Sequence, residues 1–369
     1  MVNMNLPCVQ IRPSPFIRSK SAALGQGLRA GGVMLIFIIL FLGLVRLPAR
    51  AQSAPDPQFQ SFVAKLWPEA QRRGVSRALF EVSFEGMEAD ESVLAKSRRQ
   101  PEFSKTLPDY LASAVSTSRI ETGAAKAAEL ADLLRQIEAR HGVDRHILLA
   151  VWGMETNFGG FTGNTPVLRA LATLAFSGYR GDYFQRELIS ALQILQEGHV
   201  PPQDFKGSWA GAMGQTQFMP SSFRAYAVDF DGDGRKDIWT NVADALGSSA
   251  NYLAKHGWDR DQSWGFEVLA PPGAATTFGG NYGPFGAFSR FGVTRADGAP
   301  LPPMGEAMLL TPTGENGPAF LVTKNFKVIR TYNNALAYAL GVALLADRIA
   351  GAPPVRRPWP VIEAAAERR

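Results

Sequence analysis

The spacing of apolar residues constrains this fold more than any other feature of the sequence. Apolar side chains recur every three or four positions in 57–140 and again in 335–349, which is the period of a helix that buries one face. Residues 263–325 differ, because short apolar runs alternate there with turn signals rich in Gly and Pro, a pattern that favours short strands. The sequence therefore predicts a mainly α protein with a small β element.

Composition narrows the class of protein further. The chain has 369 residues, 46% of them hydrophobic and 10% aromatic, which is enough to bury a core and excludes disorder as the dominant state. Cys8 is the single cysteine, so a disulfide framework is excluded. The formal charge of +5 comes from the first 51 residues; the rest holds 32 basic and 33 acidic residues. Nothing in this balance indicates a nucleic-acid partner.

Residues 1–51 have the pattern of a secretory signal. A basic segment precedes the apolar run 33–45, and the small-residue pattern Ala49-Arg50-Ala51 follows it. As a helix this run would span about 20 Å, which is less than the roughly 30 Å hydrocarbon core of a bilayer. We expect export to a bacterial periplasm, which is compatible with an exported chain that has no disulfides. An uncleaved anchor in the inner membrane is the alternative.

The segment 143–159 combines an apolar helical face with one acidic residue near its end. Asp144 is placed to cap the helix, and Glu155 stands beside Trp152 and Phe158. Apolar neighbours desolvate a carboxyl group and raise its pKa, because they favour the neutral form. Such a group can act as a general acid near neutral pH, so Glu155 is the candidate catalytic residue. From this segment alone, a surface glutamate on an amphipathic helix is an equal alternative.

A second segment, 207–222, reads GSWAGAMGQTQFMPSS. Its glycines let the backbone approach a ligand closely. Its amide and hydroxyl groups suit the hydroxyl and N-acetyl groups of a sugar, and its aromatic rings suit sugar faces. This mixture predicts a carbohydrate-binding loop, with a Gly-rich loop that only packs helices as the alternative.

A third segment, 229–240, has the spacing of an EF-hand-like calcium loop. The ligands at its odd positions are Asp229, Asp231, Asp233 and the carbonyl of Arg235. Thr240 stands where a bidentate glutamate is usual, and Asp244 could supply the missing carboxylate in a longer loop. We expect a structural Ca²⁺ here, with a metal-free acidic turn as the alternative. The four histidines have no ligand-like spacing, so we expect no zinc site.

In this order, the three segments resemble the lytic murein transglycosylase B family, which comprises membrane-associated or periplasmic enzymes of the lysozyme-like superfamily. The matching text is AVWGMETNFG, YRGDYFQREL, GSWAGAMGQTQFMPSSFRAYAVDFDGDGRKDIW, GSSANYLAKHGW and NFKVIRTYNNALAYALGVALLADRI. The resemblance covers roughly residues 57–350, and the string around 211–222 is the most specific to the family.

The resemblance implies a lysozyme-like core flanked by a helical domain and a small β-domain. The expected parts are the leader 1–51, a helical domain 57–140 joined by a C-terminal helix 333–350, a catalytic core 141–262 that contains the calcium loop 229–240, a β-domain 263–325 and a loose tail 352–369.

The resemblance also implies an activity. Enzymes of this family cleave the β-1,4 bond between N-acetylmuramic acid (MurNAc) and N-acetylglucosamine (GlcNAc) in peptidoglycan without adding water, and leave a 1,6-anhydro-MurNAc end. One glutamate serves as acid and base, and no cofactor takes part in the chemistry. Glycan strands are then the partner; no partner among wall-synthesis proteins is identified, and we expect a monomer.

Carried over by motif, Glu155 is the catalytic acid and base. Arg180 matches a basic position for the lactyl or peptide side of muramic acid. Residues at the family's sugar-binding positions are Ser208, Gln217, Phe218, Tyr252, Tyr332, Asn333 and Tyr338. The calcium ligands carry over to Asp229, Asp231, Asp233, Arg235 and Asp244. For each tyrosine, packing alone is the alternative.

Two other functions fit the same residues. A muramidase-type hydrolase of the same fold would release reducing ends, and it would need a second carboxylate at about 5 Å, or about 6.5–9.5 Å, from the first. A non-catalytic, calcium-stabilised wall-binding protein would bind peptidoglycan without dissolving it. The intact ETNFG segment around Glu155 argues against the second, since a binding protein has no need of that acid.

Overall fold

The computed structural model describes residues 56–98 and 105–360, so the predicted leader, 1–51, lies outside the described residues. Within these two ranges, no helix combines the length and the apolar character that crossing a membrane requires.

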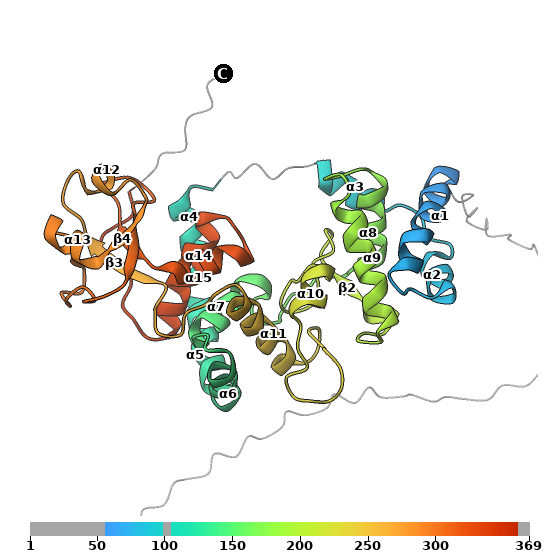
Figure 1. Ribbon diagram of the computed structural model, residues 1–369, viewed down its shortest axis with the longest axis horizontal. Coiled ribbons are helices and arrows are strands. Elements are labelled where there is room, and N and C mark those ends of the chain that lie inside the picture. The colour runs from blue at the N-terminus through green and yellow to red at the C-terminus, as the bar shows by residue number, and fades with distance from the viewer. Residues whose placement is uncertain (1–55, 99–104, 361–369) are drawn as a thin grey trace, which may run out of the picture. The chain divides into compact units, whose positions relative to one another are not determined.

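One hydrophobic core forms around two helices that pack against each other, α8 (Val167–Phe176) and α9 (Tyr183–Gln196) (Figure 1). Leu171 and Leu192 on these helices are fully buried. The other helices of this core are α1 (Pro57–Arg72), α2 (Arg77–Phe84), α3 (Glu91–Arg98) and α10 (Pro220–Tyr226). The short elements beside them are β1 (Thr165–Pro166), the 3₁₀ turn η1 (Pro202–Asp204) and β2 (Lys206–Gly207), and β1 pairs with β2.

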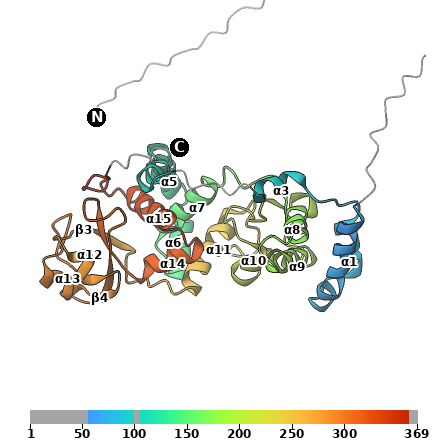
Figure 2. The same cartoon turned by 90° about the horizontal axis from the view of Figure 1, so that it is seen from above.

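A second core surrounds α7 (Arg145–Thr156), which packs along α15 (Leu336–Ile349) (Figure 2). The other helices of this core are α4 (Leu107–Ala114), α5 (Thr117–Glu129), α6 (Ala131–His141), α11 (Val242–Lys255) and α14 (Lys324–Tyr332). Leu148 to Val151 on α7 are all fully buried, which explains why apolar residues occupy every side of this helix.

The predicted start and end of α7 are confirmed. The carboxylate of Asp144 accepts hydrogen bonds from the backbone N–H groups of His146 (2.8 Å) and Ile147 (3.1 Å), which satisfies two donors that the first turn leaves open. The helix ends at Asn157, whose φ of 51° lies in the left-handed region that asparagine tolerates. Glu155 therefore lies in the last turn of a buried helix that is capped at both ends.

The β element is a five-stranded antiparallel sheet with the strand order β4-β6-β7-β3-β5. Its strands are β3 (Gly265–Leu269), β4 (Tyr282–Pro284), β5 (Thr294–Arg295), β6 (Glu306–Leu310) and β7 (Ala319–Val322). The short helices α12 (Ala274–Phe278) and α13 (Phe285–Phe291) add Ala274 and Phe288 to its apolar face. These elements lie within the predicted β-domain, 263–325.

The expected helical domain 57–140 differs from the structure, because the described helices of this range form no separate core. Helices α1 to α3 belong to the core of α8 and α9, and α4 to α6 belong to the core of α7 and α15. Val93 on α3 and Leu134 on α6 are both fully buried, but in different cores. Each half needs a different set of distant helices to cover its apolar face, and local periodicity carries no information about that choice.

The C-terminal segment 352–369 is expected to be loose, but its described part is held in place. The backbone N–H groups of Arg356 and Arg357 donate to the carboxylate of Glu267 on β3, at 2.8 and 2.9 Å. Trp359 packs against the second core. The rest of the segment, from residue 361, lies outside the described residues.

Candidate active site

Glu155 is half-buried at the end of α7, and the hydroxyl of Tyr338 on α15 donates a 2.5 Å hydrogen bond to its Oε1. Burial raises the pKa of Glu155 to about 7, although the hydrogen bond from Tyr338 opposes this rise by stabilising the carboxylate. A carboxyl group with this pKa is protonated in a large part of the molecules at neutral pH and can still lose its proton. It can therefore serve first as an acid and then as a base.

Three tyrosines from three helices lie near this carboxyl group: Tyr110 on α4, Tyr332 on α14 and Tyr338 on α15. Burial raises the pKa of each hydroxyl, and the charge of Glu155 raises it further. No sequence motif points to Tyr110, because its position on α4 reads as part of an apolar helical face. Only the packing of α4 against α15 brings it to the site.

The hydroxyls of Tyr332 and Tyr252 donate hydrogen bonds to backbone carbonyls of other segments. The Tyr332 hydroxyl donates to the carbonyl of Thr216 at 2.8 Å, and the Tyr252 hydroxyl donates to the carbonyl of Thr331 at 2.7 Å. Phe218 is 3% exposed and its ring lies 5.6 Å from that of Tyr252 and 5.8 Å from that of Tyr332. The structure thus places Phe218 under the site as packing and leaves its face no room for a sugar.

Two side chains anchor the segment 207–222 to the end of α7. The indole N–H of Trp152 donates to Oε1 of Gln215 at 3.0 Å, and the hydroxyl of Thr156 donates to the Gln215 carbonyl at 3.1 Å. Gly214, with φ of 61°, lies so close to Ile238 that a Cβ would fall 2.6 Å from its carbonyl oxygen. These contacts fix the position of the loop relative to Glu155.

Ser208 and Gln217 both remain partly accessible in this loop. The Ser208 hydroxyl accepts the N–H groups of Ala210 and Ala212, at 3.3 and 3.0 Å, and keeps its own proton available to donate. The Gln217 amide donates to the carbonyls of Thr162 (3.1 Å) and Gly214 (2.9 Å), which leaves its oxygen as an acceptor.

The two remaining predicted substrate contacts are exposed. Arg180 lies in the turn between α8 and α9 with φ of 56°, and its guanidinium lies 5.5 Å from the centre of the Tyr179 ring. Asn333 follows α14, and its Oδ1 accepts the N–H of Ala335 at 3.0 Å. Neither residue forms a hydrogen bond with Glu155.

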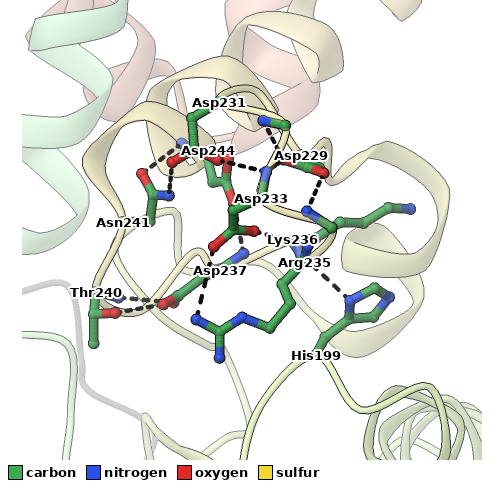
Figure 3. Close-up of polar contacts among 12 residues, drawn as sticks. His199, Asp229, Asp231, Asp233, Arg235, Lys236, Asp237, Thr240, Asn241 and Asp244 are labelled. Carbon is green, nitrogen blue, oxygen red and sulfur yellow. Dashed lines mark hydrogen bonds and ion pairs between the residues drawn. The ribbon is translucent and has the colours of Figure 1, made fainter.

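The predicted calcium loop brings three carboxylates together. Oxygen atoms of Asp229, Asp231 and Asp244 lie within 4.8 Å of one another (Figure 3). Asp244 is fully buried, and this burial, together with the charges of Asp231 and Asp229, raises its pKa. Backbone N–H groups, that of Gly234 foremost, lower the pKa of Asp229. An all-oxygen set of this kind fits a hard divalent cation.

Asp233, the third aspartate predicted for this loop, does not belong to this cluster of three. Its Oδ1 accepts the backbone N–H of Arg235 at 2.8 Å, which makes a local turn. Asp244 joins the cluster from α11 and also accepts the N–H groups of Phe230 and Asp237, each at 2.7 Å. Asp244, which was expected to be the outlying acid, is therefore the carboxylate that connects the loop to the buried helix α11.

Comparisons with known proteins agree with this geometry. A family model described as transglycosylase SLT domain matches residues 58–347. The chain is 31% identical over 312 residues to the membrane-bound lytic murein transglycosylase B of Escherichia coli (strain K12), and the match covers 80% of this chain and 84% of that protein.

Solved structures of other lytic transglycosylases are similar as well. SltB3 from Pseudomonas aeruginosa, in complex with NAG-anhNAM-pentapeptide, has a TM-score of 0.79 and 43% identity, with 83% of each chain covered. The Escherichia coli lytic transglycosylase Slt35 in complex with calcium has a TM-score of 0.68 and 29% identity, with 80% of this chain and 93% of that chain covered. The fold is therefore the lysozyme-like fold of these enzymes, mostly helical with a small antiparallel sheet. Taken with the half-buried, protonatable Glu155 and the loop anchored to the end of its helix, these matches establish that the chain belongs to the transglycosylase SLT domain family and is a lytic transglycosylase.

Proposed function

We propose that this enzyme cleaves the β-1,4 bond between MurNAc and GlcNAc in peptidoglycan without water and leaves 1,6-anhydro-MurNAc ends. The observation that carries the proposal is the carboxyl group of Glu155, whose pKa burial raises to about 7. Two relatives support the substrate and product by their names: one is a murein transglycosylase, and SltB3 is in complex with an anhydro-muramyl fragment.

The reaction needs Glu155 to donate one proton to the substrate and then to accept one from it. The neutral carboxyl of Glu155 protonates the glycosidic oxygen, the bond from that oxygen to C1 of MurNAc breaks, and GlcNAc leaves as an alcohol. The carboxylate then takes the proton of the C6 hydroxyl, whose oxygen forms a new bond to C1. A group with a pKa near the working pH serves both steps. The hydrogen bond from Tyr338 orients the carboxyl and stabilises its charged form between them.

The electrostatic surroundings of Glu155 favour a single-carboxylate mechanism over that of a retaining hydrolase. Within residues 56–98 and 105–360, burial and Tyr338 account for the shift in its pKa, and no second acid takes part. A nucleophile at about 5 Å, as in retaining hydrolases, would be charged and would raise this pKa through repulsion. Tyr110 and Tyr332 lie around the carboxyl instead.

We also propose that Asp229, Asp231 and Asp244 hold a structural Ca²⁺. Their clustered oxygens and the buried position of Asp244 support this, as does the complex of Slt35 with calcium. Bound Ca²⁺ would neutralise the repulsion among the three carboxylates and so stabilise the loop that precedes α11. It takes no part in the chemistry. The protein would act as a monomer on glycan strands in the periplasm.

The test is mass spectrometry of the soluble products from purified peptidoglycan sacculi. Wild-type protein should release anhydro-muropeptides, and Glu155→Gln should release none. The matched control is Glu121→Gln, the same substitution at an exposed position on α5, which should keep full activity. Products heavier by one water would convert the claim to hydrolysis. Binding of sacculi without any release would favour a wall-binding protein.

A further inference from the structure

Phe161 has an exposure that packing does not explain. Its side chain is 74% exposed, whereas Phe158, three residues earlier, is buried against Trp152 and Gly153. Water disfavours an exposed phenyl ring, and such a ring at the edge of a binding site offers apolar contact area to a ligand. Phe161 belongs to none of the predicted site motifs and takes no part in the chemistry described above.

The backbone that carries Phe161 is tightly determined. Asn157, Phe158 and Gly159 have φ values of 51°, 59° and 81°, so three successive residues adopt the left-handed conformation. A bulky residue such as phenylalanine seldom adopts this conformation, and such strain persists where surrounding contacts impose it. The chain turns back over the end of α7, where the N–H of Phe161 donates to the carbonyl of Thr156 at 3.0 Å.

The same loop lies against the segment 207–222, in which Ser208 and Gln217 remain partly accessible. The Gln217 amide donates to the carbonyl of Thr162, the next residue after Phe161, at 3.1 Å. Gly163 is pressed against the backbone of Gly207, the residue before Ser208, and a Cβ there would overlap the Gly207 carbonyl. Phe161 is thus connected to the segment 207–222 through the residues that follow it. Its own N–H connects it to Thr156, the residue after Glu155.

We propose that Phe161 is a substrate-contacting residue that stacks on the apolar face of a pyranose ring of the glycan strand, next to the sugars that bind at Ser208 and Gln217. A pyranose exposes C–H groups on its faces, and a flat aromatic ring with few rotatable bonds on a well-determined backbone covers them at little loss of conformational entropy. This inference rests on the proposed function for its substrate, but it concerns binding and not the bond that is broken.

Binding is measured in the Glu155→Gln background with peptide-free murein glycan strands as the probe, by isothermal titration. Replacing Phe161 with Ala should weaken binding about five- to tenfold, which is the range of one aromatic contact. Phe161→Trp should bind as well as the parent or better, whereas Phe161→Leu, which keeps apolar area but no flat face, should behave like Ala. Met304→Ala removes a side chain that is 84% exposed in the β-domain and should change nothing.

The outcomes separate this inference from the proposed function. Equal affinity of the parent and Phe161→Ala would overturn the stacking role even if the wild-type enzyme yields anhydro products. A parent that binds no strands would overturn it as well. Weakened binding by Phe161→Ala and Phe161→Leu, with Phe161→Trp intact, would support it even if the released products carry water. Unchanged melting temperatures, expected because the ring is exposed, show that folding is not the cause.

Discussion

The hydroxyl of Tyr338 donates a 2.5 Å hydrogen bond to Oε1 of Glu155, which joins α15 to the end of α7 across 183 positions of sequence. The bond stabilises the charged carboxylate, whereas burial stabilises the neutral acid, and burial is the larger effect. The pKa of Glu155 therefore depends on the balance between two features that come from different parts of the chain.

Replacing Tyr338 with Phe should raise the pKa of Glu155 above about 7, because burial remains and the stabilising hydrogen bond is lost. Since the first step needs a protonated carboxyl, the fall in kcat/KM with rising pH should move to higher pH. The matched control is Tyr282→Phe, which removes a hydroxyl bonded to the Thr323 carbonyl in the β-domain. A profile that stays in place or moves to lower pH would contradict the assigned role.

Replacing Glu155 with Gln should stabilise the protein at pH 8 and have little effect at pH 4. The folded-state pKa is about 7, against an ordinary pKa of 4.5 for a glutamate, so the folded state binds more protons between these values and loses stability as pH rises through them. The gain at pH 8 can reach about 3 kcal/mol. Urea unfolding at both pH values measures it, and a gain at pH 4 equal to that at pH 8 would disprove the linkage.

Millimolar Ca²⁺ should raise the melting temperature of the wild-type protein relative to a chelator. At a free Ca²⁺ concentration of a hundred times Kd, the free energy of unfolding should increase by about 2.7 kcal/mol. Asp231→Asn should remove most of this effect, since it takes a charge from the cluster at an exposed position. Asp204→Asn, at an exposed aspartate of η1, is the control and should respond to calcium as the wild type does. Identical midpoints with calcium and with chelator would remove the metal site.

Gly214→Ala should destabilise the protein more than Gly86→Ala and should also lower kcat. The two glycines have nearly the same φ, 61° and 64°, so both variants carry the strain of an alanine in the left-handed region, about 1 kcal/mol. Only at Gly214 would the new Cβ also meet a carbonyl oxygen, that of Ile238, at 2.6 Å; at Gly86 the space is open. Equal losses of stability in urea unfolding would show that the close approach is not structurally important.

The helix that carries Glu155 could be read from sequence because its causes are local. Asp144 caps a run of helical apolar spacing, and both the cap and the helix formed as expected. The acidic loop was readable for the same reason, since its aspartates follow one another in a short turn. Asp233 lies outside the cluster of three carboxylates, whereas Asp244 reaches the loop from a helix, and the spacing of the aspartates in sequence does not distinguish the two.

The sequence by itself thus determined the helices, the short strands, the position of the candidate catalytic acid and the position of the acidic loop, because each depends on residues within one or two turns of one another. Only the tertiary structure decided what surrounds the acid. Tyr110 and Tyr338 reach Glu155 from helices α4 and α15, Phe218 is buried under the site, and the expected domain 57–140 is divided between two cores. These contacts depend on which apolar faces pack against each other. Segments far apart in the chain determine that packing, so the local sequence does not reveal it.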